Sequence, residues 1–198
     1  MDGGIEDELG TKGFFMPIDG TKINGWQDMP EDVRKSPLVT DPKGTVFGVP
    51  AVLNADSFAY NADVIDGKEP LSFALLFESE QTLGKVGLEN TWLTTLPMAA
   101  TYLKVSKGAA IENPSSMTAD EAKLVVDFLI ARKKAGQFRA LWSSFDESVG
   151  MLAQKEAIVS NVWEPAVKAL QKKGMNFQYA FTKEGYNKWL IGAYVPSQ

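Results

Sequence analysis

Residues 144–174, SFDESVGMLAQKEAIVSNVWEPAVKALQKKG, combine two helix starts with a buried strand and so set the architecture. Ser144 and Glu147 have the spacing of a capping box, in which each side chain pairs with a free amide of the first helical turn. The apolar run 157–162 predicts a buried strand, and Pro165 suits the first turn of the following helix. Helix, strand and helix in succession predict an α/β layer with a largely parallel sheet, in which ligands bind beyond the carboxyl ends of the strands.

The alternation of strands and helices continues on both sides of this stretch. Thr118 and Glu121 form another capping box, at the start of a helix that ends before Gly136. Further strands are expected at residues 85–88, 138–142, 177–181 and 188–195, and further helices at residues 71–77 and 93–103. The side chains expected to point into the core are Ala122, Val125, Val126 and Leu129 on the helix after Thr118, and Phe145, Val149 and Leu152 on the helix after Ser144.

The chain before residue 71 has a different character. Its first 45 residues are rich in Gly, Pro, Asp and Lys and predict an irregular segment with one helical turn near residues 30–35. An extended run at residues 45–53, interrupted by Pro50, continues to a second run at residues 57–60. The N-terminal residues MDGGIEDE have no apolar stretch of a signal peptide, so the protein is either cytosolic or its natural N-terminus lies outside this sequence.

Two absences in the composition narrow the chemistry. The chain has no Cys and no His, which excludes thiol nucleophiles, disulfides, Cys-based zinc sites and the usual hydrolytic triads. We therefore expect no metal and no cofactor, while catalysis by carboxylates alone, as in glycoside hydrolysis, stays open. The net charge of −5 argues against nucleic acid and anionic lipid as partners, and no apolar run reaches the roughly 20 residues of a membrane-spanning helix.

Taken in order along the chain, several segments resemble periplasmic solute-binding proteins of ABC transporters, of the spermidine/putrescine-binding-like family. These segments are GFFMPID (13–19), GVP (48–50) with FAYN (58–61), GKVGL (84–88), FDESV (145–149), the run 157–163, and KEGY (183–186) followed by Trp189. The resemblance implies an α/β lobe of the type II periplasmic-binding-protein-like fold. Such a lobe has a mixed, largely parallel sheet flanked by helices, here with crossover strands and an irregular N-terminal segment.

The family's members are longer than this chain, so the resemblance covers mainly a second lobe. It assigns residues 1–55 to the tail of a first lobe and the first crossover strand, residues 56–187 to the second lobe, and residues 188–198 to the start of the return strand. It also implies a periplasmic receptor whose signal sequence is lost with the missing part, and whose lobes close on the ligand. Without the rest of the first lobe, Phe14, Phe15 and Trp26 should have little to bury against. This segment should then be mobile or pack on another copy of the chain.

The resemblance further implies a cleft lined by aromatic side chains. Trp163 ends a predicted strand, at a position where related receptors place an aromatic face against an alkylammonium chain. Trp189 lies on the final strand, where the family also places a cleft aromatic. Trp92, Trp142 and Tyr186 lie at other strand ends or loops and are further ligand-binding candidates. For each of them ordinary packing is the alternative, and for Trp142 packing is the favoured interpretation.

Acidic side chains would decide which solute binds. Polyamine receptors place carboxylates against ammonium groups, because a desolvated cation needs a paired anion. Glu89 and Asn90 at the end of a strand, and Glu164 at the start of a helix, are the ligand-binding candidates here. A solvated loop acid is the simpler interpretation of Glu89, and a charge that stabilises the helix terminus is the alternative for Glu164. Ile191 stands where polyamine binders carry an acid, so a smaller amine, an amino-acid derivative or another organic solute fits equally well.

Three hypotheses about function follow. The first is an extracytoplasmic receptor without enzymatic activity, which delivers a polyamine or a related amine or amino-acid-like compound to the permease subunits of an ABC importer. The second is a carboxylate-based hydrolase acting on a carbohydrate, with Glu89 and Glu164 as acid and base. The third is an interaction module without a small ligand, in which the aromatic residues are core.

Overall fold

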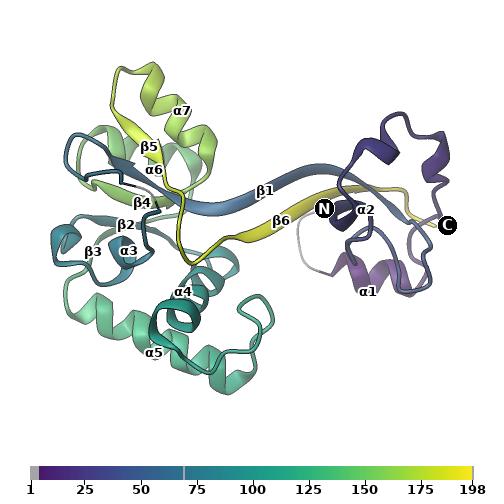
Figure 1. Ribbon diagram of the computed structural model, residues 1–198, viewed down its shortest axis with the longest axis horizontal. Helices are drawn as coiled ribbons and strands as arrows, with labels where there is room; N and C mark the ends of the chain where they lie inside the picture. Colours follow the sequence, from purple (N-terminus) through teal and green to yellow (C-terminus); the bar gives the residue numbers. More distant parts are fainter. Residues whose placement is uncertain (1–4, 69, 198) are drawn as a thin grey trace. The chain divides into compact units, whose positions relative to one another are not determined.

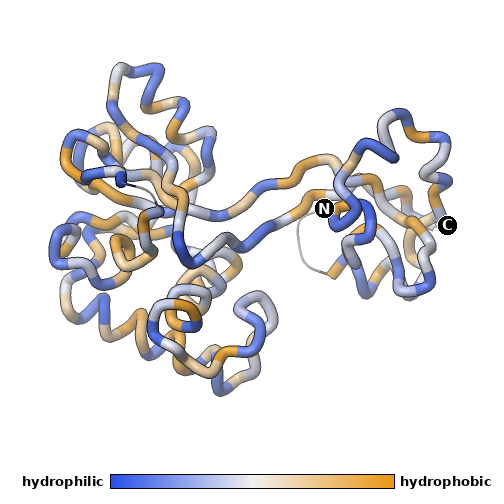
Figure 2. Tube along the Cα trace, viewed as in Figure 1, coloured by the Kyte–Doolittle hydropathy of each residue, from blue (hydrophilic) through white to orange (hydrophobic). Residues whose placement is uncertain are grey.

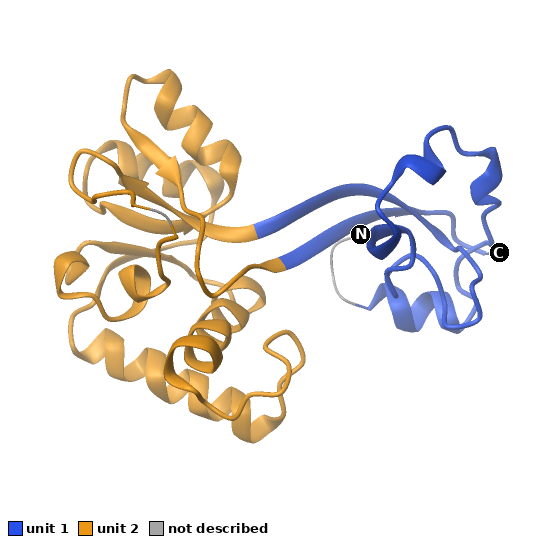
Figure 3. Cartoon of the chain, in the orientation of Figure 1, with its two compact units in different colours: residues 1–55, 188–198 blue, residues 56–187 orange. Residues whose placement is uncertain are grey.

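The computed structural model describes residues 5–68 and 70–197, and the chain divides into two compact units. The larger unit is Asp56–Asn187, and the smaller unit joins Met1–Ala55 to Lys188–Gln198 (Figure 3). Strand β1, Gly48–Asn61, contributes to both units, because its residues up to Ala55 belong to the smaller one and the rest to the larger one. Each unit has its own buried side chains.

The larger unit is built on a sheet with the strand order β3-β2-β4-β1-β5 (Figure 1). Besides β1, these strands are β2 Val86–Glu89, β3 Phe138–Trp142, β4 Val159–Val162 and β5 Phe177–Tyr179. β2 is parallel to both β3 and β4, whereas β1 is antiparallel to both β4 and β5. Four strands therefore share one direction and β1 runs against them, which confirms the expected mixed, largely parallel sheet.

Helices cover both faces of this sheet. They are α3 Ala74–Phe77, α4 Trp92–Lys107, α5 Ala119–Lys134, α6 Phe145–Ala153 and α7 Glu164–Lys172, with a 3-10 turn at Glu80–Thr82. On β1, Phe58 packs with side chains of α3, α4 and α5, and the next residue, Ala59, packs with α6 and α7 on the opposite face. Figure 2 shows hydrophobic and hydrophilic residues alternating along the helices, as expected where each helix turns one side to the core.

Local sequence signals fix where two of these helices begin. The Thr118 hydroxyl accepts a hydrogen bond from the Glu121 amide, and the Ser144 hydroxyl accepts one from the Glu147 amide. In both cases the glutamate carboxylate returns the bond to the backbone of the capping residue, so both predicted capping boxes are confirmed. Among the residues that the structure describes, no helix combines the length and the apolar character needed to cross a membrane.

Two side chains expected in the core are exposed instead. Val126 follows Val125, which is fully buried, and each residue turns a helix by about 100°, so the two side chains cannot both face the sheet. Phe145 is the first residue of α6, and this helix reaches the core one turn later, at Val149. The apolar stripes of α5 and α6 are therefore narrower than the sequence pattern predicts.

The smaller unit contains α1 Glu6–Thr11, 3-10 turns at Gly20–Lys22 and Trp26–Asp28, α2 Glu31–Arg34, part of β1, and most of β6 Asn187–Tyr194, which pairs with β1. The expectation that Phe15 and Trp26 have little to bury against is wrong, since each is only 7% exposed. Phe15 bridges to Pro196, and its ring stacks on Tyr194 with centroids 4.6 Å apart. Residues near the C-terminus thus help to bury Phe15, while Phe14 is 55% exposed.

Candidate functional site

The carboxyl ends of β2, β3 and β4 meet at one edge of the sheet, because these strands are parallel neighbours. At this edge Glu89 of β2 lies opposite Trp142 of β3, and Val162 of β4 lies opposite Ser57 of β1. β1 enters the sheet here, so Asp56, the residue before Ser57, lies at the same edge. In α/β sheets this edge is where ligands bind.

Glu89 is held at the end of β2 through its backbone and its side chain. Its N–H donates to Asn161 Oδ1 at 2.8 Å, and its carbonyl oxygen accepts from the Thr95 hydroxyl at 2.8 Å. The Thr94 hydroxyl donates to Glu89 Oε2. Burial raises the pKa of the Glu89 carboxyl above its ordinary value, and the hydrogen bond from Thr94 opposes part of this rise.

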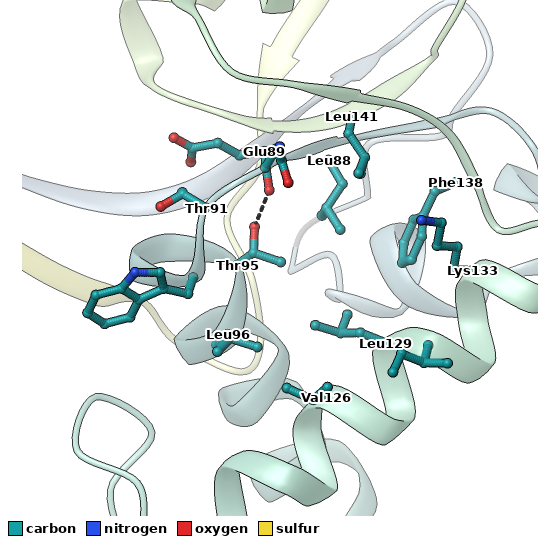
Figure 4. Close-up of a pocket in the computed structure, with 13 residues that line it drawn as sticks. Leu88, Glu89, Thr91, Thr95, Leu96, Val126, Leu129, Lys133, Phe138 and Leu141 are labelled. Carbon is teal, nitrogen blue, oxygen red and sulfur yellow. Dashed lines mark hydrogen bonds between the residues drawn. The ribbon is translucent and has the colours of Figure 1, made fainter.

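A cavity of about 520 Å³ lies beside Glu89, lined by β2, β3, α4 and α5. Most of its lining is apolar and comes from Leu88, Leu96, Val126, Leu129, Ile130, Phe138 and Leu141. Figure 4 shows the side-chain oxygens of Glu89 and Thr91 pointing away from Leu129 and Phe138. The cavity therefore has two parts, a polar edge at the end of β2 and an apolar groove between α4 and α5.

The turn from β2 into α4 presents further candidates predicted from the sequence. The Asn90 N–H donates to the Trp142 carbonyl oxygen at 2.8 Å, which orders the turn. The Thr91 hydroxyl accepts from the Leu93 N–H at 3.3 Å and caps α4. Trp92, the first residue of α4, is 69% exposed. Asn90 and Trp92 thus lie with Glu89 at the polar edge.

Trp142 and Trp163 form an edge-to-face pair, with ring centroids 5.7 Å apart and planes at 83°. Trp142 is 2% exposed, and its Nε1–H donates to Ser160 Oγ at 3.0 Å, so it packs beneath the edge and does not face solvent. Trp163 is partly buried and occupies the N-cap position of α7. Trp163 therefore keeps a face at the strand edge, and Trp142 supports it from below.

A second acidic group lies on the other side of β4. Glu164 opens α7 and forms an ion pair with Lys168 at 3.0 Å, as a helix-start acid does. Asp56 is a buried acid that the sequence analysis missed, although a lone acid in the extended run before Phe58 was a signal for it. Burial raises the pKa of Tyr179, and the hydrogen bond from the Ser57 N–H opposes part of this rise. The negative charges of Asp56 and Glu164 raise the pKa of Tyr179 further. The three side chains are therefore electrostatic neighbours.

The two remaining candidates, Tyr186 and Trp189, belong to different units. Tyr186 belongs to the larger unit, is partly exposed, and its hydroxyl accepts from the Thr182 N–H at 3.2 Å. Trp189 belongs to the smaller unit, where it lines a cavity of about 180 Å³ beside the ion pair of Asp32 and Lys188. Within residues 5–68 and 70–197 there is no group of three or more His, Cys, Asp and Glu side chains that could hold a metal ion.

Residues 6–198 match the family of bacterial extracellular solute-binding proteins. A similar solved structure is the spermidine/putrescine ABC transporter substrate-binding protein PotD from Streptococcus pneumoniae, with a TM-score of 0.75 at 18% identity over 97% of this chain and 55% of that chain. MotA from A. tumefaciens B6 in complex with glucopine has a TM-score of 0.65 at 21% identity, over 96% and 54% of the two chains. The Atu4243–GABA receptor has a TM-score of 0.66 at 19% identity, over 99% and 54%.

The chain spans about half the length of these solved structures. At such identities the likeness concerns the fold, and it agrees with the type II periplasmic-binding-protein fold that the sequence predicts. The family match rests on the sequence itself and runs from residue 6 to residue 198. This chain therefore belongs to the family of bacterial extracellular solute-binding proteins.

Proposed function

We propose that this chain is part of an extracytoplasmic receptor that captures a small amine or amino-acid-like solute and delivers it to an ABC importer. The observation that carries the proposal is the gathering of Glu89, Asn90, Trp92 and Trp163 at the strand edge of the larger unit. Membership of a solute-binding family favours reversible capture without turnover over the hydrolase alternative. The ligands named for the similar structures, spermidine and putrescine, GABA and glucopine, support a small nitrogen-containing solute.

On this proposal the two units correspond to parts of two lobes. The larger unit is the second lobe, residues 1–55 are the tail of the first lobe with its crossover strand, and residues 188–198 begin the return strand. The whole receptor acts in the periplasm, and the permease subunits of the importer recognise its closed form. Trp189 then belongs to the return strand.

The chemistry of the edge suits a cation carried on an alkyl chain. The half-buried Glu89 carboxylate has only a neutral hydroxyl as its hydrogen-bond partner among the described residues, so its charge is free to pair with an ammonium group. The Trp163 face offers a surface for the adjoining methylene groups and for the cation itself. Asp56 and Glu164 add negative charge on the other side of β4.

The proposal is tested by titrating the chain with putrescine, spermidine and GABA, followed by calorimetry and thermal shift. We expect saturable binding of at least one amine, weakened about tenfold or more by Glu89→Gln, because a hydrogen bond to a charged group contributes about 1.5–3 kcal/mol. Asp127→Asn is the matched control, since Asp127 is an exposed acid on α5 that pairs with Lys123. A folded chain that binds none of these solutes, or that releases product from a carbohydrate panel, would contradict the proposal.

A further inference from the structure

The end of β2 extends beyond its backbone pairing with β4. The pairing of β2 with β4 covers Val86 and Gly87, whereas β2 continues to Glu89. At Glu89 the side chain of Asn161, which is buried, accepts the N–H bond at 2.8 Å. A side-chain amide of β4 thus replaces a backbone carbonyl as the acceptor and keeps the last residue of β2 in the sheet.

Two hydroxyl groups of α4 hold the same residue from the other side. The Thr95 hydroxyl donates to the Glu89 carbonyl oxygen at 2.8 Å, and Thr95 is itself buried. The Thr94 hydroxyl donates to Oε2 of the carboxylate. Every backbone polar group of Glu89 and one of its two carboxylate oxygens therefore has a partner.

We propose that Asn161, Thr95 and Thr94 are positioning residues that present the Glu89 carboxylate to the solute. This inference rests on the proposed function, because it concerns the same edge. Asn161 and Thr95 fix the backbone, and Thr94 fixes the side chain in the direction that Figure 4 shows, away from the apolar groove.

The arrangement favours binding for two physical reasons. A glutamate side chain loses rotamer entropy when it is immobilised, and here folding has already immobilised it before the solute arrives. The hydrogen-bond partner of the carboxylate, Thr94, is neutral, so no internal cation in the described part of the chain neutralises the charge of Glu89. The other charged side chain that lines this cavity, Lys133, lies among the apolar residues of the groove, beside Phe138 in Figure 4.

The test compares Thr94→Val, which removes the hydroxyl and keeps the shape, with Thr94→Ser, which keeps the hydroxyl. The carboxyl titration of Glu89 is followed by NMR in the solute-free chain. Loss of the donor removes an interaction that favours the ionised form, so Thr94→Val should titrate at higher pH than wild type, and Thr94→Ser like wild type. Equal titration of the two variants would overturn the inference, provided that circular dichroism shows both to be folded.

The same pair is then titrated with putrescine. Thr94→Val should weaken binding about threefold to tenfold and Thr94→Ser should not, because one hydrogen bond contributes about 0.5–1.5 kcal/mol. Equal affinities of the two variants would also overturn the inference. If none of the proteins, wild type included, binds any amine, the proposed function fails, while the NMR titration of the solute-free chain still decides whether Thr94 positions Glu89.

Discussion

Glu184 is a buried carboxylate in the larger unit, and its replacement by alanine should destabilise that unit. Its Oε1 accepts from the Ser72 hydroxyl at 2.5 Å and from the Ser106 hydroxyl at 2.6 Å, and its Oε2 accepts from the Phe73 N–H at 3.2 Å. Phe73 is fully buried, so its orphaned N–H costs about 1–3 kcal/mol. The two serine hydroxyls are half-buried, can find water, and add about 0.5 kcal/mol each. We expect Glu184→Ala to lower the free energy of unfolding by about 3 kcal/mol.

The measurement is urea unfolding of the whole chain, followed by circular dichroism and tryptophan fluorescence. With a slope of about 2 kcal/mol per molar urea, the transition of the larger unit should move down by about 1.5 M. Glu184→Gln keeps the size and one acceptor oxygen, so it should lose about half as much. If Glu184→Ala unfolds at the wild-type midpoint with an unchanged slope, the three hydrogen bonds do not stabilise the unit and the reasoning is refuted.

Three further variants should change stability in defined ways, each read by urea unfolding. Ser160→Ala removes the acceptor of the Trp142 Nε1–H and should cost about 1–3 kcal/mol; a loss below 0.5 kcal/mol would contradict the assigned bond. Folding raises the pKa of Glu89 above its ordinary value of 4.5, so the folded state binds the proton more tightly than the unfolded state. The free energy of unfolding should therefore fall as pH rises from 4.5 through the folded-state pKa, and Glu89→Gln should abolish this fall. Burial raises the pKa of Glu78, but the hydrogen bonds from Lys107 and Tyr102 and the charges of Lys107 and Arg132 together outweigh this effect. The pKa of Glu78 is therefore lowered on folding. Its contribution should therefore disappear as pH falls through the folded pKa, and Glu78→Gln should flatten the acid side of the stability curve.

The fold of the larger unit could be predicted because its signals are local. Capping boxes at Thr118 and Ser144, and glycines with positive φ just after two helices, Gly136 and Gly174, each place an element within a few residues of its position. The smaller unit could not be predicted in the same way. The burial of Phe15 depends on residues 194–196, and no pattern within a short window reports contacts over such a separation.

The candidate site shows the same division. Parallel strands bring their carboxyl ends together, so the sequence alone was enough to place Glu89 and Trp163 at one edge. The sequence did not reveal that Trp142 lies beneath Trp163. Both tryptophans lie at the ends of predicted strands, and only the register of the sheet decides which of the two is buried. Asp56 was missed since its place at the edge depends on the antiparallel pairing of β1 with β4.

The edge-to-face indole pair has an optical consequence that needs no added label. Two indole chromophores at 5.7 Å are close enough for their transition dipoles to interact, and the resulting exciton signal in circular dichroism depends steeply on their mutual angle. One ring of the pair is fixed by burial and by its bond to Ser160, so a change of that signal reports motion of Trp163 alone. Binding of a molecule to the Trp163 face should therefore change the rotational strength of the exciton signal, even where the total fluorescence of the five tryptophans stays constant.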